Sequence, residues 1–225
     1  MITIKEYLQE TKFVTHQLIQ MINNIENHKN QVIHAQEMIS LHINDAQIYE
    51  KFSRVVWADG AEEEFFDLRE RSLEKLRTAG DLQYQLTEIQ NLYNNTLLII
   101  NSPLQSVAQA LLQIAKQGIS SEHGKNKNNC STNLLDAGKM IINKFNVPIL
   151  DIIWEGRNQS IHYEESNPFP PVRQCFNSLL QNSDDKCQAL LGFDQGQNKA
   201  YEIVKILDWT DISNFESDLS SLSRT

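Results

Sequence analysis

The segment Arg157-Asn158-Gln159-Ser160-Ile161-His162 is the one stretch of the chain whose residue types and spacing indicate chemistry. The guanidinium of Arg157 is always charged and can hold two phosphate oxygens at once. The imidazole of His162 can give or take a proton near neutral pH. Asn158 and His162 lie one helical turn apart, and the long Arg157 side chain can reach the same cleft although it starts about 140° around the helix. The segment therefore combines a phosphate-binding group with a proton-transfer group.

A helix over residues 149 to about 165 is predicted to position these side chains. Its apolar stripe has helical spacing and contains an arginine: Leu150, Ile153, Trp154, Arg157 and Ile161. An unpaired guanidinium is costly to bury, so Arg157 should face a carboxylate, a groove or the phosphate of a ligand. Gly156 inside the helix indicates close approach of another backbone, and we expect a packed partner helix there.

This helix resembles the motif of HEPN domains, all-helical modules in which an arginine precedes a histidine by a short spacer and is often followed by asparagine. Asn158 holds that position here, and an apolar run at residues 149–156 precedes the motif. The resemblance implies a homodimer whose two motifs meet to form one metal-independent endoribonuclease site. Arg157 would hold the scissile phosphate, His162 would act as general acid or base, and Asn158 would orient the pair.

The resemblance also implies a biological role and a set of partners. We expect a toxin or antiphage effector that cleaves RNA, forms a homodimer and is restrained by an antitoxin or another regulatory protein, with no cofactor and no metal. In HEPN toxins neutralised by a nucleotidyltransferase, the modified tyrosine lies two residues after the histidine. Here Tyr163 follows His162 directly and Glu164 holds the usual place, so Tyr163 is expected to pack or to line the cleft.

Two other interpretations compete with this one. Asp151, Glu155 and Arg157 are faintly similar to the acidic metal site of restriction-like nucleases, although that site needs strands and a wider gap between the acids. Alternatively, the chain is a catalytically silent helical module that dimerises and binds a partner through its N-terminal hairpin. Whether Arg157 and His162 open into a cleft at a two-fold interface would separate this module from the nuclease.

The remaining elements are predicted to be helical, which makes the fold class all-α. Apolar residues recur at three- and four-residue steps over 4–27 and 31–55, which indicates an N-terminal helical hairpin. A polar loop is predicted at 118–130, and the pattern over 187–207 allows a small β-hairpin or two short helices. Further helices are predicted over 62–79, 82–100, 104–119, 133–145, 172–180 and 211–222.

Length and composition define the expected organisation of the chain. With 225 residues, 40% of them hydrophobic, it is predicted to hold a HEPN-like helical bundle at 59–182, between an N-terminal hairpin at 1–58 and a C-terminal extension at 183–225. No apolar run is long enough to span a membrane, and the beginning of the chain does not look like a signal peptide. We therefore expect a cytoplasmic protein without a membrane partner.

Charge and cysteine content limit the possible partners. The net charge of −9 offers no general basic surface for nucleic acid, so a nuclease would depend on a small local cluster of positive charge. The three cysteines lie far apart without a C-x-x-C pair, which argues against a zinc site or a disulfide framework and favours a reducing compartment.

Overall fold

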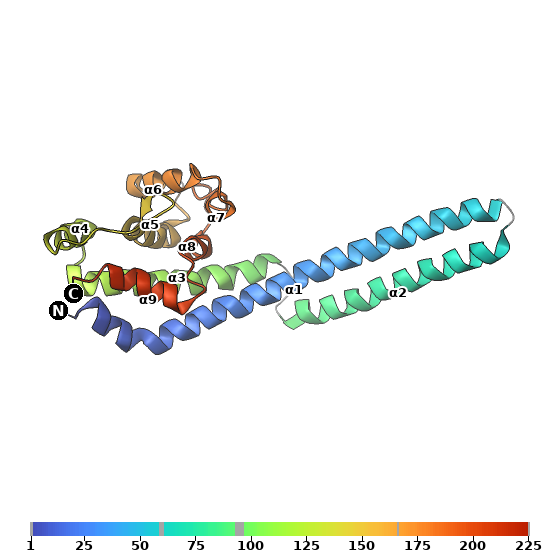
Figure 1. Ribbon diagram of the computed structural model, residues 1–225, viewed down its shortest axis with the longest axis horizontal. Coiled ribbons are helices and arrows are strands. Elements are labelled where there is room, and N and C mark those ends of the chain that lie inside the picture. The colour runs from blue at the N-terminus through green and yellow to red at the C-terminus, as the bar shows by residue number, and fades with distance from the viewer. Residues whose placement is uncertain (1, 59–60, 93–96, 166, 225) are drawn as a thin grey trace. The chain divides into compact units, whose positions relative to one another are not determined.

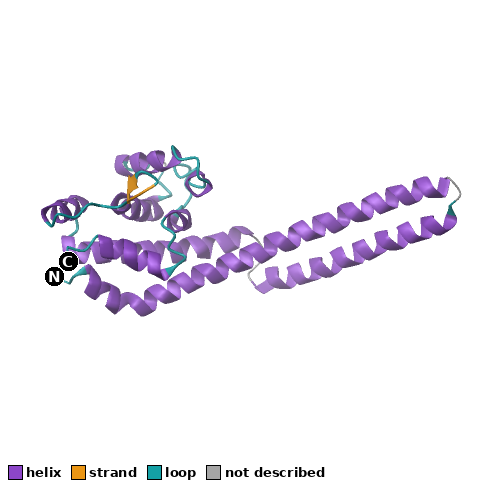
Figure 2. Cartoon of the chain, viewed as in Figure 1, coloured by secondary structure: helices purple, strands orange, loops and turns teal. Residues whose placement is uncertain are grey.

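The computed structural model describes residues 2–58, 61–92, 97–165 and 167–224, and its fold is all-α (Figures 1 and 2). Contacts divide the chain into two compact units. The core unit comprises Met1–Asn24 and Ser102–Thr225, and the hairpin unit comprises Ile25–Asn101. Among the described residues, no helix combines the length and the apolar character needed to cross a membrane.

The hairpin unit is built from the part of α1 (Ile4–Ala58) that begins at Ile25 and from α2 (Glu62–Leu92), which run alongside each other (Figure 1). The predicted turn between residues 27 and 31 is wrong, because α1 is one continuous helix. Residues 4–58 contain neither glycine nor proline, so nothing in this stretch interrupts the helix. The predicted break at Gly80 is also wrong, since α2 continues through it; a Cβ there would meet no atom within 4 Å.

Buried side chains at a seven-residue spacing form the seam between α1 and α2. Buried positions recur at seven-residue steps on both helices: Val32, Ile39, Ala46 and Ser53 on α1, and Ser72 and Ala79 on α2. Ser72 Oγ donates a hydrogen bond to the carbonyl of Ala46 at 3.0 Å, and Lys75 Nζ lies 3.2 Å from a carboxylate oxygen of Asp45. The heptad spacing therefore serves an antiparallel pair of helices within one chain.

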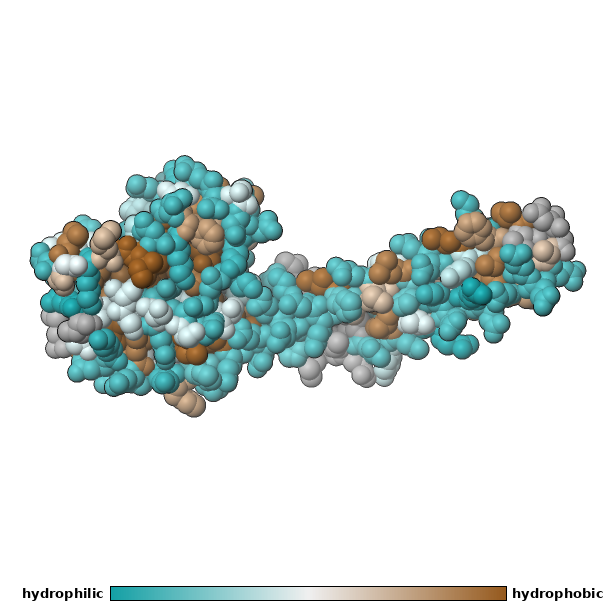
Figure 3. Space-filling view, viewed as in Figure 1, coloured by the Kyte–Doolittle hydropathy of each residue, from teal (hydrophilic) through white to brown (hydrophobic). Residues whose placement is uncertain are grey.

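Many large hydrophobic side chains of the hairpin unit lie outside this seam. Figure 3 shows hydrophobic side chains along the surface of the unit. The exposed ones are Leu41, Ile43, Ile48, Phe52, Val55, Trp57, Phe66, Leu73, Leu76 and Tyr84. Four of them, Leu41, Ile48, Phe52 and Val55, follow one another on α1 at steps of seven, four and three residues, which is the spacing of a second apolar stripe.

The core unit surrounds the helix that carries the motif. Its elements are α3 (Leu97–His123, from Ser102 onward), α4 (Lys127–Asp136), β1 (Asn143–Lys144), β2 (Val147–Pro148), α5 (Ile149–His162), α6 (Pro170–Leu180), α7 (Asp185–Gln188), α8 (Ala200–Ile206) and α9 (Ile212–Ser221). The motif helix α5 packs against α6 on one side and α8 on another.

Gly156 is where α5 and α8 come closest. A Cβ built on Gly156 would lie 2.8 Å from Cγ2 of Ile203, which is closer than a real side chain can approach. The expected close approach of a second helix is thus confirmed, and the partner is α8.

Several boundaries within the core unit differ from the predictions. The predicted loop at 118–130 is largely helical, because α3 extends to His123 and the Asn126 side chain caps α4 by accepting from the Asn128 N–H at 3.0 Å. The predicted helix over 133–145 ends at Asp136. Gly138 then adopts a positive φ of 69°, and the chain continues into β1.

The small sheet pairs β1 with β2 in antiparallel fashion, with Asn143 opposite Pro148 and Lys144 opposite Val147. Its two turn residues, Phe145 and Asn146, both have positive φ, as tight hairpin turns require. This hairpin comes earlier in the chain than the site predicted for one. At residues 187–207 the structure has short helices, α7 and α8, so the helical alternative is the one observed.

Other predicted elements hold with small changes. The helices predicted at 149–165, 172–180 and 211–222 correspond to α5, α6 and α9. The helix predicted over 104–119 begins earlier than expected, because α3 starts at Leu97 and continues through Pro103. The division into 1–58, 59–182 and 183–225 differs from the two units of the structure, since residues 4–24 and the whole C-terminal segment belong to the core unit.

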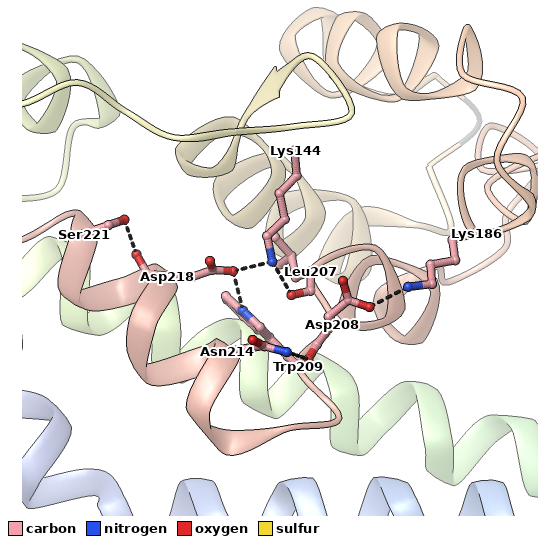
Figure 4. A network of polar contacts seen from close by, with 8 residues as sticks. All are labelled: Lys144, Lys186, Leu207, Asp208, Trp209, Asn214, Asp218 and Ser221. Atoms are coloured by element: carbon pink, nitrogen blue, oxygen red, sulfur yellow. Dashed lines mark hydrogen bonds and ion pairs between the residues drawn. The ribbon is translucent and has the colours of Figure 1, made fainter.

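A polar network joins the C-terminal elements of the core unit to β1 (Figure 4). Lys144 Nζ lies 2.9 Å from Oδ2 of Asp218 and also donates to the carbonyl of Leu207. The buried indole of Trp209 donates to the same Asp218 oxygen at 2.9 Å. The buried carboxylate is thereby both charge-balanced and hydrogen-bonded, as burial requires.

Candidate functional site

Arg157 lies on the side of α5 that faces α3 and is half-buried. Its Nε donates a hydrogen bond to Oε1 of Gln113 at 2.6 Å. Burial lowers the pKa of the guanidinium below its ordinary value. Within the described residues no carboxylate lies in ion-pair distance of Arg157. Of the three expected surroundings of Arg157, which were a carboxylate, a groove and the phosphate of a ligand, the carboxylate is therefore not observed.

Lys116 is the neighbour of Arg157 that the sequence analysis did not single out. Its Nζ donates to Oδ1 of Asn158 at 2.9 Å and lies 4.4 Å from the ring centroid of Trp154. Burial, followed by the charge of Arg157, lowers the pKa of Lys116 to about 8, while Glu155 acts in the opposite direction. The described part of the chain supplies no carboxylate in ion-pair distance of this ammonium either. Two cations thus lie near each other between α3 and α5.

Asn158 links this basic pair to an acidic neighbour. Its amide oxygen accepts from Lys116, and its Nδ2 donates to Oε2 of Glu155 at 3.1 Å. The residue expected to orient Arg157 and His162 is in fact bonded to Lys116 and Glu155.

His162 lies at the exposed C-terminal end of α5. Its Nδ1 is 2.7 Å from Oε1 of Glu165, and its ring contacts Phe169 edge-on with centroids 5.5 Å apart. A carboxylate at Nδ1 holds the proton on that nitrogen and leaves Nε2 as the reactive atom. Glu165 is not among the site residues expected from the sequence, although a carboxylate three residues after a histidine near a helix end is a recognisable signal.

A small pocket between α5 and α6 brings two of the three predicted site residues together. Asn158 and His162 both line it, together with Tyr163 and Phe169. Tyr163 therefore lines the cleft as expected, with its hydroxyl donating to Glu164 at 3.1 Å. Arg157 is not part of this lining, so within one chain the arginine and the histidine belong to different sides of α5.

The residues between Arg157 and His162 have structural contacts. Gln159 is buried, and its amide nitrogen donates to the carbonyls of Phe193 and Gln197 at 3.2 and 2.7 Å. Its amide oxygen accepts from the N–H of Lys199 at 3.1 Å. The motif helix thereby also fixes the segment that leads into α8.

Asp151 and Glu155, the carboxylates of the metal-nuclease alternative, are paired with one lysine. Lys127 Nζ lies 2.9 Å from Oδ1 of Asp151 and 2.6 Å from Oε1 of Glu155. The three side chains line a cavity of about 210 Å³ that also includes Gln174. No group of three or more metal-ligating side chains gathers anywhere in the described residues. The two acids lie one turn apart on a helix rather than on strands, with an ammonium between them.

Comparison with models of known protein families, with curated proteins and with solved structures gave no match to this chain. Its function must therefore be inferred from the side chains of α3, α5 and the segment that follows α5.

Proposed function

We propose that this protein is a metal-independent endoribonuclease of the HEPN type, with Arg157, His162 and Asn158 at its site. The carrying observation is the half-buried guanidinium of Arg157, whose hydrogen-bond acceptor is a neutral amide rather than a carboxylate. A buried cation is stable when an anion compensates it, and a phosphate of RNA would do so. The proposal extends to a cytoplasmic toxin or antiphage effector held in check by an antitoxin or regulatory protein.

The reaction would proceed by transfer within the RNA backbone. His162 would take the proton of a 2′-hydroxyl, and the 2′-oxygen would attack the adjacent phosphorus. The bond to the 5′-oxygen would break, and that oxygen would leave with a proton from an acid, which a second histidine of a dimer can supply. Arg157 would stabilise the charge that develops on the non-bridging oxygens. The products would be a 2′,3′-cyclic phosphate and a 5′-hydroxyl.

A second copy of the chain is part of this proposal. Arg157 faces Gln113 on α3, whereas His162 contacts Phe169 at the start of α6. A site that uses both groups on one phosphate is easier to assemble from two motifs than from one.

Cleavage of single-stranded RNA in EDTA tests the proposal. We expect wild-type cleavage to persist in EDTA, and His162→Ala to lower its rate by roughly 10²- to 10⁴-fold, the usual contribution of a proton-transfer group. Arg157→Ala should be at least as damaging, and Arg157→Lys should not restore the rate, because an ammonium cannot reproduce the planar two-point grip. Arg173→Ala, which removes an exposed arginine on α6, is the matched control and should cleave normally.

Two results would contradict the proposal. Cleavage that stops in EDTA and returns with Mg²⁺ would favour Asp151 and Glu155 as the site. Cleavage that survives both alanine substitutions would remove the ribonuclease assignment to this motif.

The second candidate function is a silent module that dimerises and binds a partner through the hairpin unit. The exposed apolar stripe of Leu41, Ile48, Phe52 and Val55 favours it, because exposed apolar patches mark interaction surfaces. A chain that forms stable dimers but leaves RNA intact under all conditions would favour this function.

A further inference from the structure

We propose that Lys116 and Arg157 together form a binding site for one backbone phosphate of single-stranded RNA, at the place where the side chains of α3 and α5 meet. This inference rests on the proposed function for the identity of the ligand, and it adds Lys116 as a second phosphate-binding residue.

Neutral amides hold both cations across the two helices. Gln113 of α3 accepts from Arg157 of α5, and Asn158 of α5 accepts from Lys116 of α3. Gln113 and Lys116 are one turn apart on their helix, so the two hydrogen bonds lie side by side. An amide oxygen fixes the position of a cation but leaves its charge uncompensated. The side chains of Lys116 and Arg157 are therefore held in place and still carry their two positive charges.

Two other partly buried lysines of the core unit are paired with acids, whereas the buried Lys199 donates to the carbonyl of Ala189. Lys127 lies between Asp151 and Glu155, and Lys144 lies against Asp218. These ion pairs balance the charge, as is usual for buried lysines. Lys116 and Arg157 stand beside each other instead, and the repulsion between them is part of what lowers the pKa of Lys116. An anion between them would relieve that repulsion.

Glu155 is the nearest acid that acts on Lys116, and both of its oxygens are engaged. Oε1 lies 2.6 Å from Lys127 Nζ, and Oε2 accepts from Asn158 Nδ2 at 3.1 Å. The carboxylate is also buried, so it is not free to move onto the basic pair. The compensating anion must come from outside the chain.

The donors that remain fit a phosphodiester. The ammonium of Lys116 has three N–H groups and gives one to Asn158, while the face of Trp154 supports it from one side. Arg157 uses Nε for Gln113 and keeps the N–H groups of both Nη atoms. One non-bridging oxygen can therefore bind to the guanidinium and the other to the ammonium. A free phosphate offers the same chemistry, so the test must distinguish the two sources.

Fluorescence anisotropy with a labelled 2′-O-methyl oligoribonucleotide separates binding from cleavage, because this RNA lacks the attacking hydroxyl. We expect the full-length protein to bind it, and Lys116→Met to weaken binding about tenfold and to flatten the dependence on salt, as loss of a phosphate contact does. Lys125→Met is the matched control: it removes the same charge at an exposed position and should bind like wild type. Neither variant should melt at a markedly lower temperature than wild type.

The outcomes separate this inference from the proposed function. Binding that depends on Lys116 and Arg157 without any cleavage of unmodified RNA would support the phosphate site and end the ribonuclease proposal. Cleavage that depends on Arg157 while Lys116→Met binds as well as wild type would overturn the role of Lys116. Inorganic phosphate that competes at the same concentration as the oligonucleotide would overturn the assignment of the site to RNA.

Discussion

At the scale of single residues, the charge of Lys116 depends on pH not far above neutrality. Its pKa is lowered from 10.5 to about 8, first by burial and then by Arg157, while Glu155 acts against the shift; both of these charged groups lie on α5. The ammonium should therefore lose its proton as the pH rises through about 8. A phosphodiester and an arginine keep their charges over this range.

Binding of the 2′-O-methyl oligonucleotide should consequently weaken between pH 7 and pH 9. Lys116→Arg should bind with little dependence on pH over the same range, since its guanidinium stays charged. Anisotropy titrations at constant ionic strength measure both. Below pH 8 the folded and unfolded chains are both protonated at this position, and between about 8 and 10.5 only the unfolded chain is. The free energy of unfolding of wild type should thus rise with pH between about 8 and 10.5 relative to that of Lys116→Met. Oligonucleotide binding by wild type that does not change between pH 7 and pH 9 would contradict the role of Lys116 in phosphate binding.

The sequence indicates only part of this site. Arg157 could be found because its charge interrupts an apolar stripe, which local spacing reveals. Lys116 could not be found in this way, because its partners Trp154 and Asn158 come from a different helix and no local pattern links them. The same holds for the acceptor Gln113. Site residues that depend on packing between helices become visible only in the folded chain.

At the scale of elements, Gly156 shows what positions the motif helix. A Cβ there would lie 2.8 Å from Cγ2 of Ile203, and a β-branched side chain in a helix has little freedom to move away. Overpacking usually costs about 1–3 kcal/mol, and the better helix propensity of alanine offsets about 1 kcal/mol of that cost, so Gly156→Ala should lower the free energy of unfolding by up to about 2 kcal/mol.

Gly80→Ala is the matched control for this substitution. Gly80 also lies within a helix, but a Cβ there meets no atom within 4 Å, so alanine should stabilise α2 by roughly 0.5–1 kcal/mol. Urea unfolding followed by circular dichroism compares the two variants. Equal effects of the two substitutions would show that α8 does not constrain α5 at Gly156.

Glycine, proline and capping residues predict some element boundaries and fail at others, since α2 continues through Gly80 and α3 continues through Pro103. The proline-rich segment 167–171 correctly separates α5 from α6. Two helices over 4–27 and 31–55 are predicted where the structure has the single helix α1, although residues 28–30 contain no glycine or proline that would break it. A seven-residue apolar repeat shows that a helix packs against a partner, but it does not show which helix is the partner. Tertiary contacts decide that, and a local pattern does not contain them.

At the scale of the whole molecule, we predict a homodimer of the 25.9 kDa chain. The reason is that Arg157 and His162 lie on different sides of α5, so one phosphate can meet both groups most simply when two motifs combine. Multi-angle light scattering at micromolar concentrations should give twice the mass of the chain. A monomer at these concentrations that still cleaves RNA would contradict the composite site.

The exposed stripe on α1 gives the dimer measurement a useful control. Phe52→Glu places a charge on the stripe, far along the sequence from the motif, and is expected to leave the dimer intact if the core unit forms the interface. Loss of the dimer in this variant would place the contact on the hairpin unit and favour the interaction module.

Glu155 connects the basic pair to Lys127 of α4, and this makes Lys116 and Lys127 genetically interdependent. A neutral residue at position 127 would leave a buried carboxylate without its cation, and the nearest remaining ammonium is that of Lys116. Glu155 would then neutralise the charge that phosphate binding needs. A change at Lys127 is therefore tolerable only together with a change at Glu155, so substitutions at Lys116 and Lys127 should show epistasis rather than additive effects.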